Sequence, residues 1–119
     1  MFDFEKFEVY KKAKQFTKEI SDYLENIPSK NTRIVDQLSR ASLSIPLNIA
    51  EGAGRYSKAD KKHFYTIARG SVFECIALFD ILLDKKLLEL ELKQKWYRDL
   101  EELSKMLSGL INSQKLERK

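Results

Sequence analysis

Apolar residues recur every three or four positions along most of this 119-residue chain, and charged residues fill the gaps between them. This spacing gives an α-helix one apolar face and one polar face. Four such stretches follow one another and predict helices over residues 4–26, 32–51, 58–83 and 91–112. Four amphipathic helices with short connections favour an all-α fold, an antiparallel up-down-up-down four-helix bundle.

The breaks between the stretches contain residues that end or begin helices. Gly52 and Gly54 close the second stretch, and either can adopt the positive φ of a helix cap. Ser57 followed by Asp60 resembles a capping box and predicts the start of the third helix. Pro46 lies inside the second stretch, and we predict a kinked helix there because the apolar period continues past it. The alternative is a break, with Pro46 opening a second short helix.

Small and aromatic side chains indicate how the helices pack. Ala68, Gly70 and Ser71 form a small-residue patch in the third helix, which predicts close approach of another helix. Trp96 lies on the apolar stripe of the fourth helix and is expected in the core. Tyr97, its neighbour, is a candidate for a subunit interface.

Length and composition indicate one domain over residues 1–119, with a frayed polar tail over 113–119. The first residues are charged and no apolar run approaches the roughly 20 residues of a membrane span, so we expect a cytoplasmic protein. The single cysteine, Cys75, excludes an intrachain disulfide and is expected to be a small buried apolar residue.

Positive charge is concentrated in the middle of the chain. Residues 28–71 contain eight basic and three acidic side chains, whereas the segments on either side are close to neutral. Cations can contact phosphates, and interleaved aromatic rings can stack on unpaired bases. The candidate nucleic-acid-binding residues are Arg55, Tyr56, Lys58, Lys61, Lys62 and Arg69. The alternative is a solvated basic surface without a ligand.

No pattern in the sequence indicates catalysis. His63 is the only histidine and lies among lysines, and the Glu-x-x-His pairs of carboxylate-bridged metal sites in helix bundles are absent. The turn after Gly54 is not a phosphate-binding P-loop, since no strand precedes it and the lysine signature is missing. We therefore expect no catalytic residues, no metal, no cofactor and no enzymatic activity.

The segment from Arg40 to Glu74 is similar to a known family. It contains the runs RASLSIPLNIAEGAGRYSKAD and IARGSVFE, which resemble the pattern of the four helix bundle proteins encoded by intervening sequences of bacterial 23S rRNA genes. The resemblance implies a four-helix bundle that forms a ring-like homo-oligomer, with a pentamer as the first expectation. It also implies a relationship to the basic accessory protein of diversity-generating retroelements, which works with a reverse transcriptase and nucleic acid. The residues of this segment with expected structural roles are Arg40, Pro46, Asn48, Glu51, Gly52, Gly54, Ser57, Gly70 and Glu74.

The charged members of this motif allow two interpretations. Arg40, Glu51, Arg69 and Glu74 could form a phosphate-binding or catalytic cluster. They could instead pair and hold neighbouring helices or subunits in register, which the equal numbers of each sign favour.

The sequence thus predicts a non-enzymatic, homo-oligomeric bundle that binds nucleic acid, with RNA favoured by the genomic setting of the family. The alternative is a protein-interaction scaffold that docks another protein, such as a polymerase. Binding to a membrane is not expected.

Overall fold

The computed structural model describes residues 2–114 and consists of four α-helices, with no strand among these residues. The helices are α1 (Glu8–Leu24), α2 (Thr32–Ala53), α3 (Lys58–Asp84) and α4 (Leu90–Asn112). Short 3-10 turns precede α1 (Asp3–Lys6) and α2 (Ser29–Asn31). The four-helix bundle is confirmed; of the predicted tail, residues 115–119 lie outside the described range.

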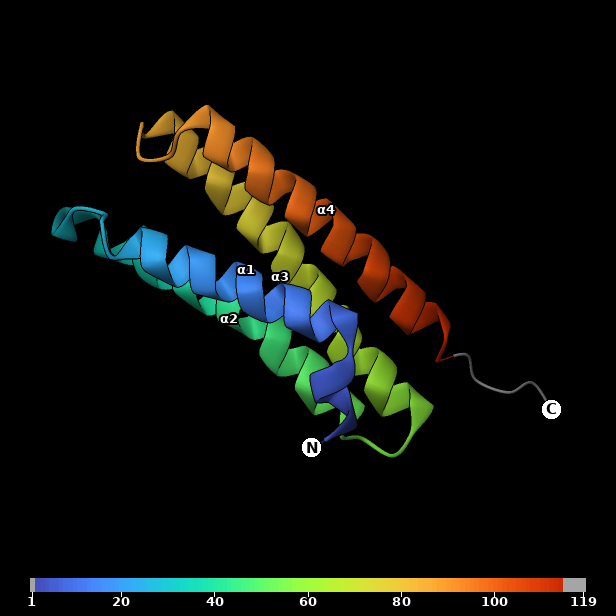
Figure 1. The fold of residues 1–119 in the computed structure, drawn as a ribbon. Coiled ribbons are helices and arrows are strands. Elements are labelled where there is room, and N and C mark those ends of the chain that lie inside the picture. Colours follow the sequence, from blue (N-terminus) through green and yellow to red (C-terminus); the bar gives the residue numbers. More distant parts are fainter. Residues whose placement is uncertain (1, 115–119) are drawn as a thin grey trace.

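The helices form an elongated body of 54 × 27 × 22 Å, in which each helix runs back along the one before it (Figure 1). The most extensive packing is between α2 and α3, followed by α3 with α4 and α1 with α2. The remaining neighbours, α1 and α4, share the least contact. No helix in the described part of the chain has the length and apolar character needed to cross a membrane.

The core is built where the four apolar stripes meet. Trp96 of α4 is 2% exposed, as expected, and its ring stacks on Phe79 of α3 at 5.4 Å between centroids. Phe16 of α1 meets both rings edge-on, at 6.2 and 6.5 Å. These three large rings from three helices add to the buried apolar area that stabilises the fold. Cys75 is also fully buried, as predicted.

Pro46 lies inside an uninterrupted α2, and the kink stays a prediction. A proline has no N–H to donate, so the carbonyl four residues earlier, that of Ser42, loses its helical donor. Thr17 of α1 supplies one instead: its hydroxyl donates to the Ser42 carbonyl oxygen at 2.9 Å. The gap in the α2 hydrogen-bond ladder therefore becomes a contact between α1 and α2.

The glycines have other roles than predicted. No glycine in residues 2–114 has a positive φ, so Gly52 and Gly54 do not form the predicted left-handed cap. Gly52 is buried inside α2, and a Cβ there would lie 2.7 Å from Cε1 of Tyr65. This glycine is needed because α2 and α3 approach closely at this point. The predicted close approach at Gly70 is wrong, since a Cβ there would meet nothing within 4 Å.

The first helix begins later than predicted. Residues 3–6 form a separate 3-10 turn, and Phe7 is extended at φ −67° and ψ 127° before α1 starts. The ring of Phe4 then packs edge-on against Tyr10, with 4.9 Å between centroids. An uninterrupted helix would place these two residues on different sides, so aromatic packing favours the break.

Candidate nucleic-acid interface

The turn between α2 and α3 positions most of the predicted nucleic-acid-binding residues at one end of the bundle. Gly54 ends α2 at φ −82°, and Ser57 caps α3 by accepting a hydrogen bond from the Asp60 N–H at 3.0 Å. The predicted capping role of Ser57 is confirmed. Arg55 and Tyr56 fill the turn between these two residues, and Lys58 is the first residue of α3.

Two cations at this turn make contacts within the chain. The Lys61 ammonium donates to the Ala53 carbonyl oxygen at 2.9 Å, where it satisfies an acceptor at the C-terminal end of α2. Arg55 donates to Glu51 at 2.5 Å, and its guanidinium lies 4.5 Å from the centre of the Phe64 ring. Both side chains thus make contacts that stabilise the turn, and their role in binding nucleic acid stays a prediction.

Arg69 lies three helical turns further along α3, away from the turn. Its Nε donates to the Ser108 hydroxyl of α4 at 3.0 Å, and its guanidinium lies 4.7 Å from the centre of the Phe73 ring. This arginine therefore connects α3 to α4. The fold does not bring it together with the other candidates.

Three candidates remain at the surface. Tyr56 is fully exposed, and Lys58 and Lys62 are exposed one helical turn apart on α3. Within residues 2–114, neither lysine side chain takes part in a hydrogen bond or an ion pair. The depression beside them is lined by Glu51 and Asp60 as well as Arg55, so its mixed charge gives it no preference for anions. The exposed residues Tyr56, Lys58 and Lys62 lie together at the start of α3 and are called here the turn surface.

The motif residues on α2 and α3 make polar contacts, some within α2 and some between the two helices. The Asn48 amide donates to the carbonyl and to the hydroxyl of Ser44, at 2.8 and 2.9 Å, and the Ser71 hydroxyl donates to Ser44 at 2.8 Å. Nearer the other end of the two helices, Gln37 of α2 donates to Glu74 of α3 at 2.6 Å. The small residue Ser71 is thus at a close helix contact, as predicted for its neighbourhood.

The four motif charges do not pair with one another inside the chain. Glu51 accepts a hydrogen bond from Arg55, and Glu74 accepts one from Gln37. Arg69 donates its hydrogen bond to Ser108. Arg40 is exposed, and no ion pair to it exists among the described residues. Pairing between subunits, the other half of that hypothesis, stays a prediction.

Comparison with known proteins identifies the family to which this sequence motif belongs. Residues 5–109 match the family described as 23S rRNA-intervening sequence protein. The chain belongs to this family. The fold is shared with the crystal structure of a protein of unknown function from the S23 ribosomal protein family of Bacteroides thetaiotaomicron. That protein is 25% identical, with a TM-score of 0.80 over 87% of this chain and 97% of the other. No curated protein matches.

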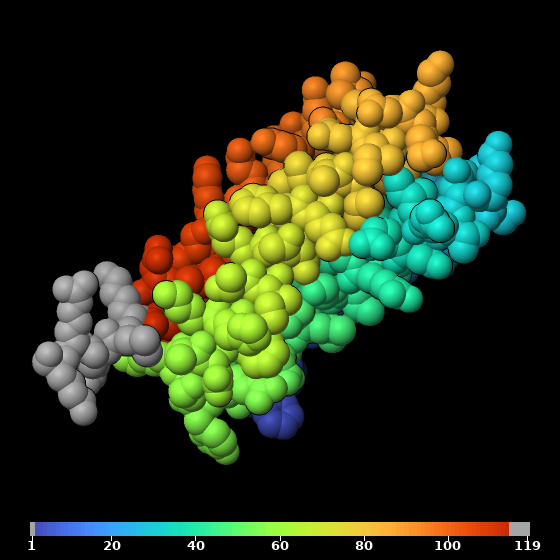
Figure 2. Space-filling model, turned by 180° about the vertical axis from the view of Figure 1, so that it is seen from behind, coloured from blue at the N-terminus to red at the C-terminus, as the bar shows by residue number. Residues whose placement is uncertain are grey.

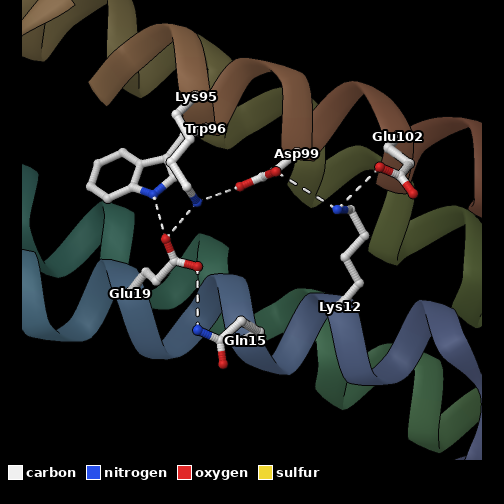
Figure 3. Close-up of polar contacts among 7 residues, drawn as sticks. All are labelled: Lys12, Gln15, Glu19, Lys95, Trp96, Asp99 and Glu102. Carbon is white, nitrogen blue, oxygen red and sulfur yellow. Dashed lines mark hydrogen bonds and ion pairs between the residues drawn. The ribbon is translucent and has the colours of Figure 1, made fainter. Parts of the chain in front are cut away.

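In this member of the 23S rRNA-intervening sequence protein family, the sequence interpretation missed a polar network between α1 and α4 (Figure 3). Lys95 lies between Glu19 and Asp99, at 2.7 and 2.9 Å, and Lys12 lies 3.7 Å from Asp99 and 3.2 Å from Glu102. The Trp96 indole N–H also donates to Glu19, at 3.4 Å. The hydrogen bond to Glu19 is the main cause that raises the pKa of Lys95.

This network connects two helices and has the features of a structural contact. Its lysines and carboxylates satisfy one another, and no group of three or more metal-ligating side chains occurs in the described part of the family member. The only sequence signal was the spacing of Lys95 and Asp99, four residues apart, which also fits an ordinary solvated face. His63 is exposed and touches Phe64 edge-on at 5.2 Å between centroids.

Proposed function

We propose that this family member is a non-enzymatic, homo-oligomeric protein that binds nucleic acid through the turn surface. The observation that supports this most directly is Tyr56, a large aromatic side chain that is fully exposed next to two exposed lysines. Packing among residues 2–114 leaves this ring exposed to solvent. Stacking on an unpaired base would cover it, since every base has a flat face and such contacts tolerate any sequence.

The positive charges beside Tyr56 are arranged to suit a single strand of nucleic acid. Lys58 and Lys62 are four residues apart, so their side chains lie on one side of α3 and can follow a phosphate backbone. The N-terminal end of α3 adds its partial positive charge at the same place. RNA is favoured over DNA because the family is named after intervening sequences of 23S rRNA.

Self-association would strengthen a small site of this kind. A surface of two lysines and one tyrosine binds weakly alone, but several copies on one strand raise the overall affinity by orders of magnitude when the strand reaches them together. The proposed homo-oligomer and the proposed RNA binding therefore support each other. The number of subunits, expected from the resemblance to be five, is part of the proposal.

The test is a salt titration of binding to a fluorescently labelled single-stranded RNA, followed by anisotropy. We expect Lys58→Gln with Lys62→Gln to reduce the slope of log affinity against log salt by about 1.4, which is about 0.7 for each lost phosphate contact. Tyr56→Ala should weaken binding by about 1–3 kcal/mol with little change of slope. The matched control is Lys85→Gln with Lys86→Gln, two exposed lysines at the opposite end of α3.

Two results would refute the proposal. One is wild-type protein that shows no salt-sensitive binding to RNA or DNA. The other is an equal loss of affinity in the control variant, which would indicate a general charge effect. Lys61 is left unchanged because it holds the α2 terminus, and its replacement would mix folding with binding.

A protein-interaction scaffold is the second candidate, supported by exposed apolar side chains on the bundle surface, among them Phe73 and Ile81 of α3. A pull-down after nuclease treatment separates the candidates. A partner protein that is retained without nucleic acid supports the scaffold, whereas loss of all captured material supports binding through nucleic acid.

A further inference from the structure

A groove lies between the start of α2 and the end of α3, at the end of the bundle opposite the turn surface. It has a volume of about 400 Å³, and its floor is formed by Ile34 of α2 with Leu78 and Ile81 of α3. Leu78 belongs to the core, whereas Ile81 is 44% exposed, so the groove extends the core to the surface. We call it the α2–α3 groove. In Figure 2, the start of α2 (cyan) and the end of α3 (gold) lie side by side.

The rim of the α2–α3 groove is positively charged. Lys30, Arg33 and Lys85 are exposed and line it, and none of the described residues that line it is acidic. Within residues 2–114, none of these three cations takes part in an ion pair. Glu74 lies one helical turn before Leu78, but it accepts a hydrogen bond from Gln37 at 2.6 Å. The groove therefore lacks the negative charge that would balance its rim.

The N-terminal end of α2 adds to this positive potential. Asn31 occupies the cap position without capping the helix, because its amide donates to the Pro28 carbonyl oxygen at 3.4 Å. The first N–H groups of a helix carry partial positive charge, and here no side chain at the cap position accepts from them. Asn31, Arg33 and Ile34 all line the groove, so this helix end lies at its edge. The helix end and the cations favour an anionic partner at the same place.

The apolar floor distinguishes between the possible anionic partners. A strand of nucleic acid offers phosphates and flat bases, but no aromatic ring lines the described groove for a base to stack on. A small molecule is mostly enclosed by its site, whereas the exposure of Ile81 keeps this groove open. A protein segment meets both features, since one large apolar side chain can cover the aliphatic floor while neighbouring carboxylates reach the rim.

We propose that the α2–α3 groove binds an acidic segment of another protein, with a large apolar side chain on the aliphatic floor and carboxylates against the cations of the rim. The inference rests on the second candidate of the proposed function, the protein-interaction scaffold, and names the chemistry of its partner. The site is formed by one chain alone, so it requires no particular number of copies. A groove of this size provides a small interface, and the segment binds weakly.

The test is fluorescence anisotropy of a labelled peptide, Glu-Asp-Leu-Phe-Asp-Glu, titrated with nuclease-treated protein. A second peptide has serine in place of leucine and phenylalanine, and a third has glutamine and asparagine in place of the acids. We expect each of these two to bind about tenfold more weakly, because one lacks the apolar anchor and the other lacks the charges.

Substitutions at the groove locate the binding site. Ile81→Ser should weaken binding of the first peptide about tenfold, because it removes an exposed part of the apolar floor. Arg33→Gln with Lys85→Gln should weaken it about fivefold and reduce its dependence on salt, since exposed ion pairs are modest and screened. Circular dichroism shows that each variant is folded.

Two control variants make the same kinds of change elsewhere. Phe73→Ser removes an apolar side chain of α3 that is 48% exposed and lies outside the groove. Lys58→Gln with Lys62→Gln removes two charges at the turn surface, at the other end of α3. Both variants should bind the first peptide as the wild type does.

The proposal is overturned if the first peptide does not bind at millimolar protein, if the three peptides bind equally, or if the groove variants bind like the wild type. It is also overturned if a single-stranded RNA displaces the peptide from the wild type and from the Lys58→Gln, Lys62→Gln variant alike, because the groove would then be a nucleic-acid site. These failures leave the scaffold itself open, since the nuclease-treated pull-down can still retain a partner on another surface. Failure of the RNA titration at the turn surface leaves the peptide result unchanged.

Discussion

Thr17→Val tests whether the hydroxyl of Thr17 compensates for Pro46. The substitution keeps the shape of the side chain and removes the donor that reaches the Ser42 carbonyl oxygen at 2.9 Å. Ser42 is 2% exposed, so water cannot easily replace this donor. An acceptor left unsatisfied in a buried place costs about 1–3 kcal/mol of stability. We therefore expect Thr17→Val to lower the free energy of unfolding by about 2 kcal/mol.

The same substitution should cost less in a Pro46→Ala background. An alanine at this position restores the backbone N–H, which can donate to the Ser42 carbonyl as in any α-helix. The carbonyl then keeps a donor after Thr17→Val. The two substitutions should therefore show a coupling free energy of about 1–2 kcal/mol.

Urea unfolding of the four proteins, followed by circular dichroism, measures this coupling. An effect of about 2 kcal/mol moves the midpoint by roughly 1 M urea. Equal costs of Thr17→Val in the two backgrounds would refute the reasoning, because the hydroxyl would then not compensate for the proline. A Thr17→Ser variant, which keeps the hydroxyl, is the control and should lie closer to the wild type.

Three further outcomes follow from the packing and the pKa values. Gly70→Ala should raise the free energy of unfolding by about 0.5–1 kcal/mol, because the added Cβ meets nothing. Gly52→Ala should have a free energy of unfolding about 1–3 kcal/mol lower than Gly70→Ala in the same urea assay, because its Cβ meets the buried ring of Tyr65. Burial raises the pKa of Cys75 to about 12, so a thiol reagent should modify it only after denaturation. Pairing with Glu19 raises the pKa of Lys95 above 10.5; this stabilisation is complete below that pH and is lost as the pH rises through the raised pKa. The stability difference between wild type and Lys95→Met should therefore shrink in alkaline urea titrations.

The helices could be predicted closely from the sequence because their signals are local. The apolar period and the Ser57 cap predicted the start of α3 at the observed residue, Lys58. The predicted end of α2, Glu51, lies two residues before the observed end at Ala53. The first turn was not predictable in this way, because the edge-on contact of Phe4 with Tyr10 outweighs local helix propensity.

The candidate site was predictable only in part. Composition identified the basic residues, but it could not show that Lys61 is held by the Ala53 carbonyl or that Arg69 is held by Ser108, 39 residues away. Such partners are chosen by tertiary packing. The same holds for Leu43 and Leu47 of α2, which are exposed although they are leucines four residues apart in a helix. Only the fold shows that both lie outside the core.

The unequal packing between neighbouring helices determines which part of the fold opens first by local unfolding. The boundary between α1 and α4 is closed at its surface by the charges in Figure 3, and it has the least packing of the four boundaries. Ion pairs of this exposure contribute little against local unfolding. The outer helices should therefore separate transiently while α2 and α3 stay together, so amide hydrogens of α1 and α4 should exchange with solvent deuterium first. The central hairpin of α2 and α3, which carries the turn surface, would be the last part to open.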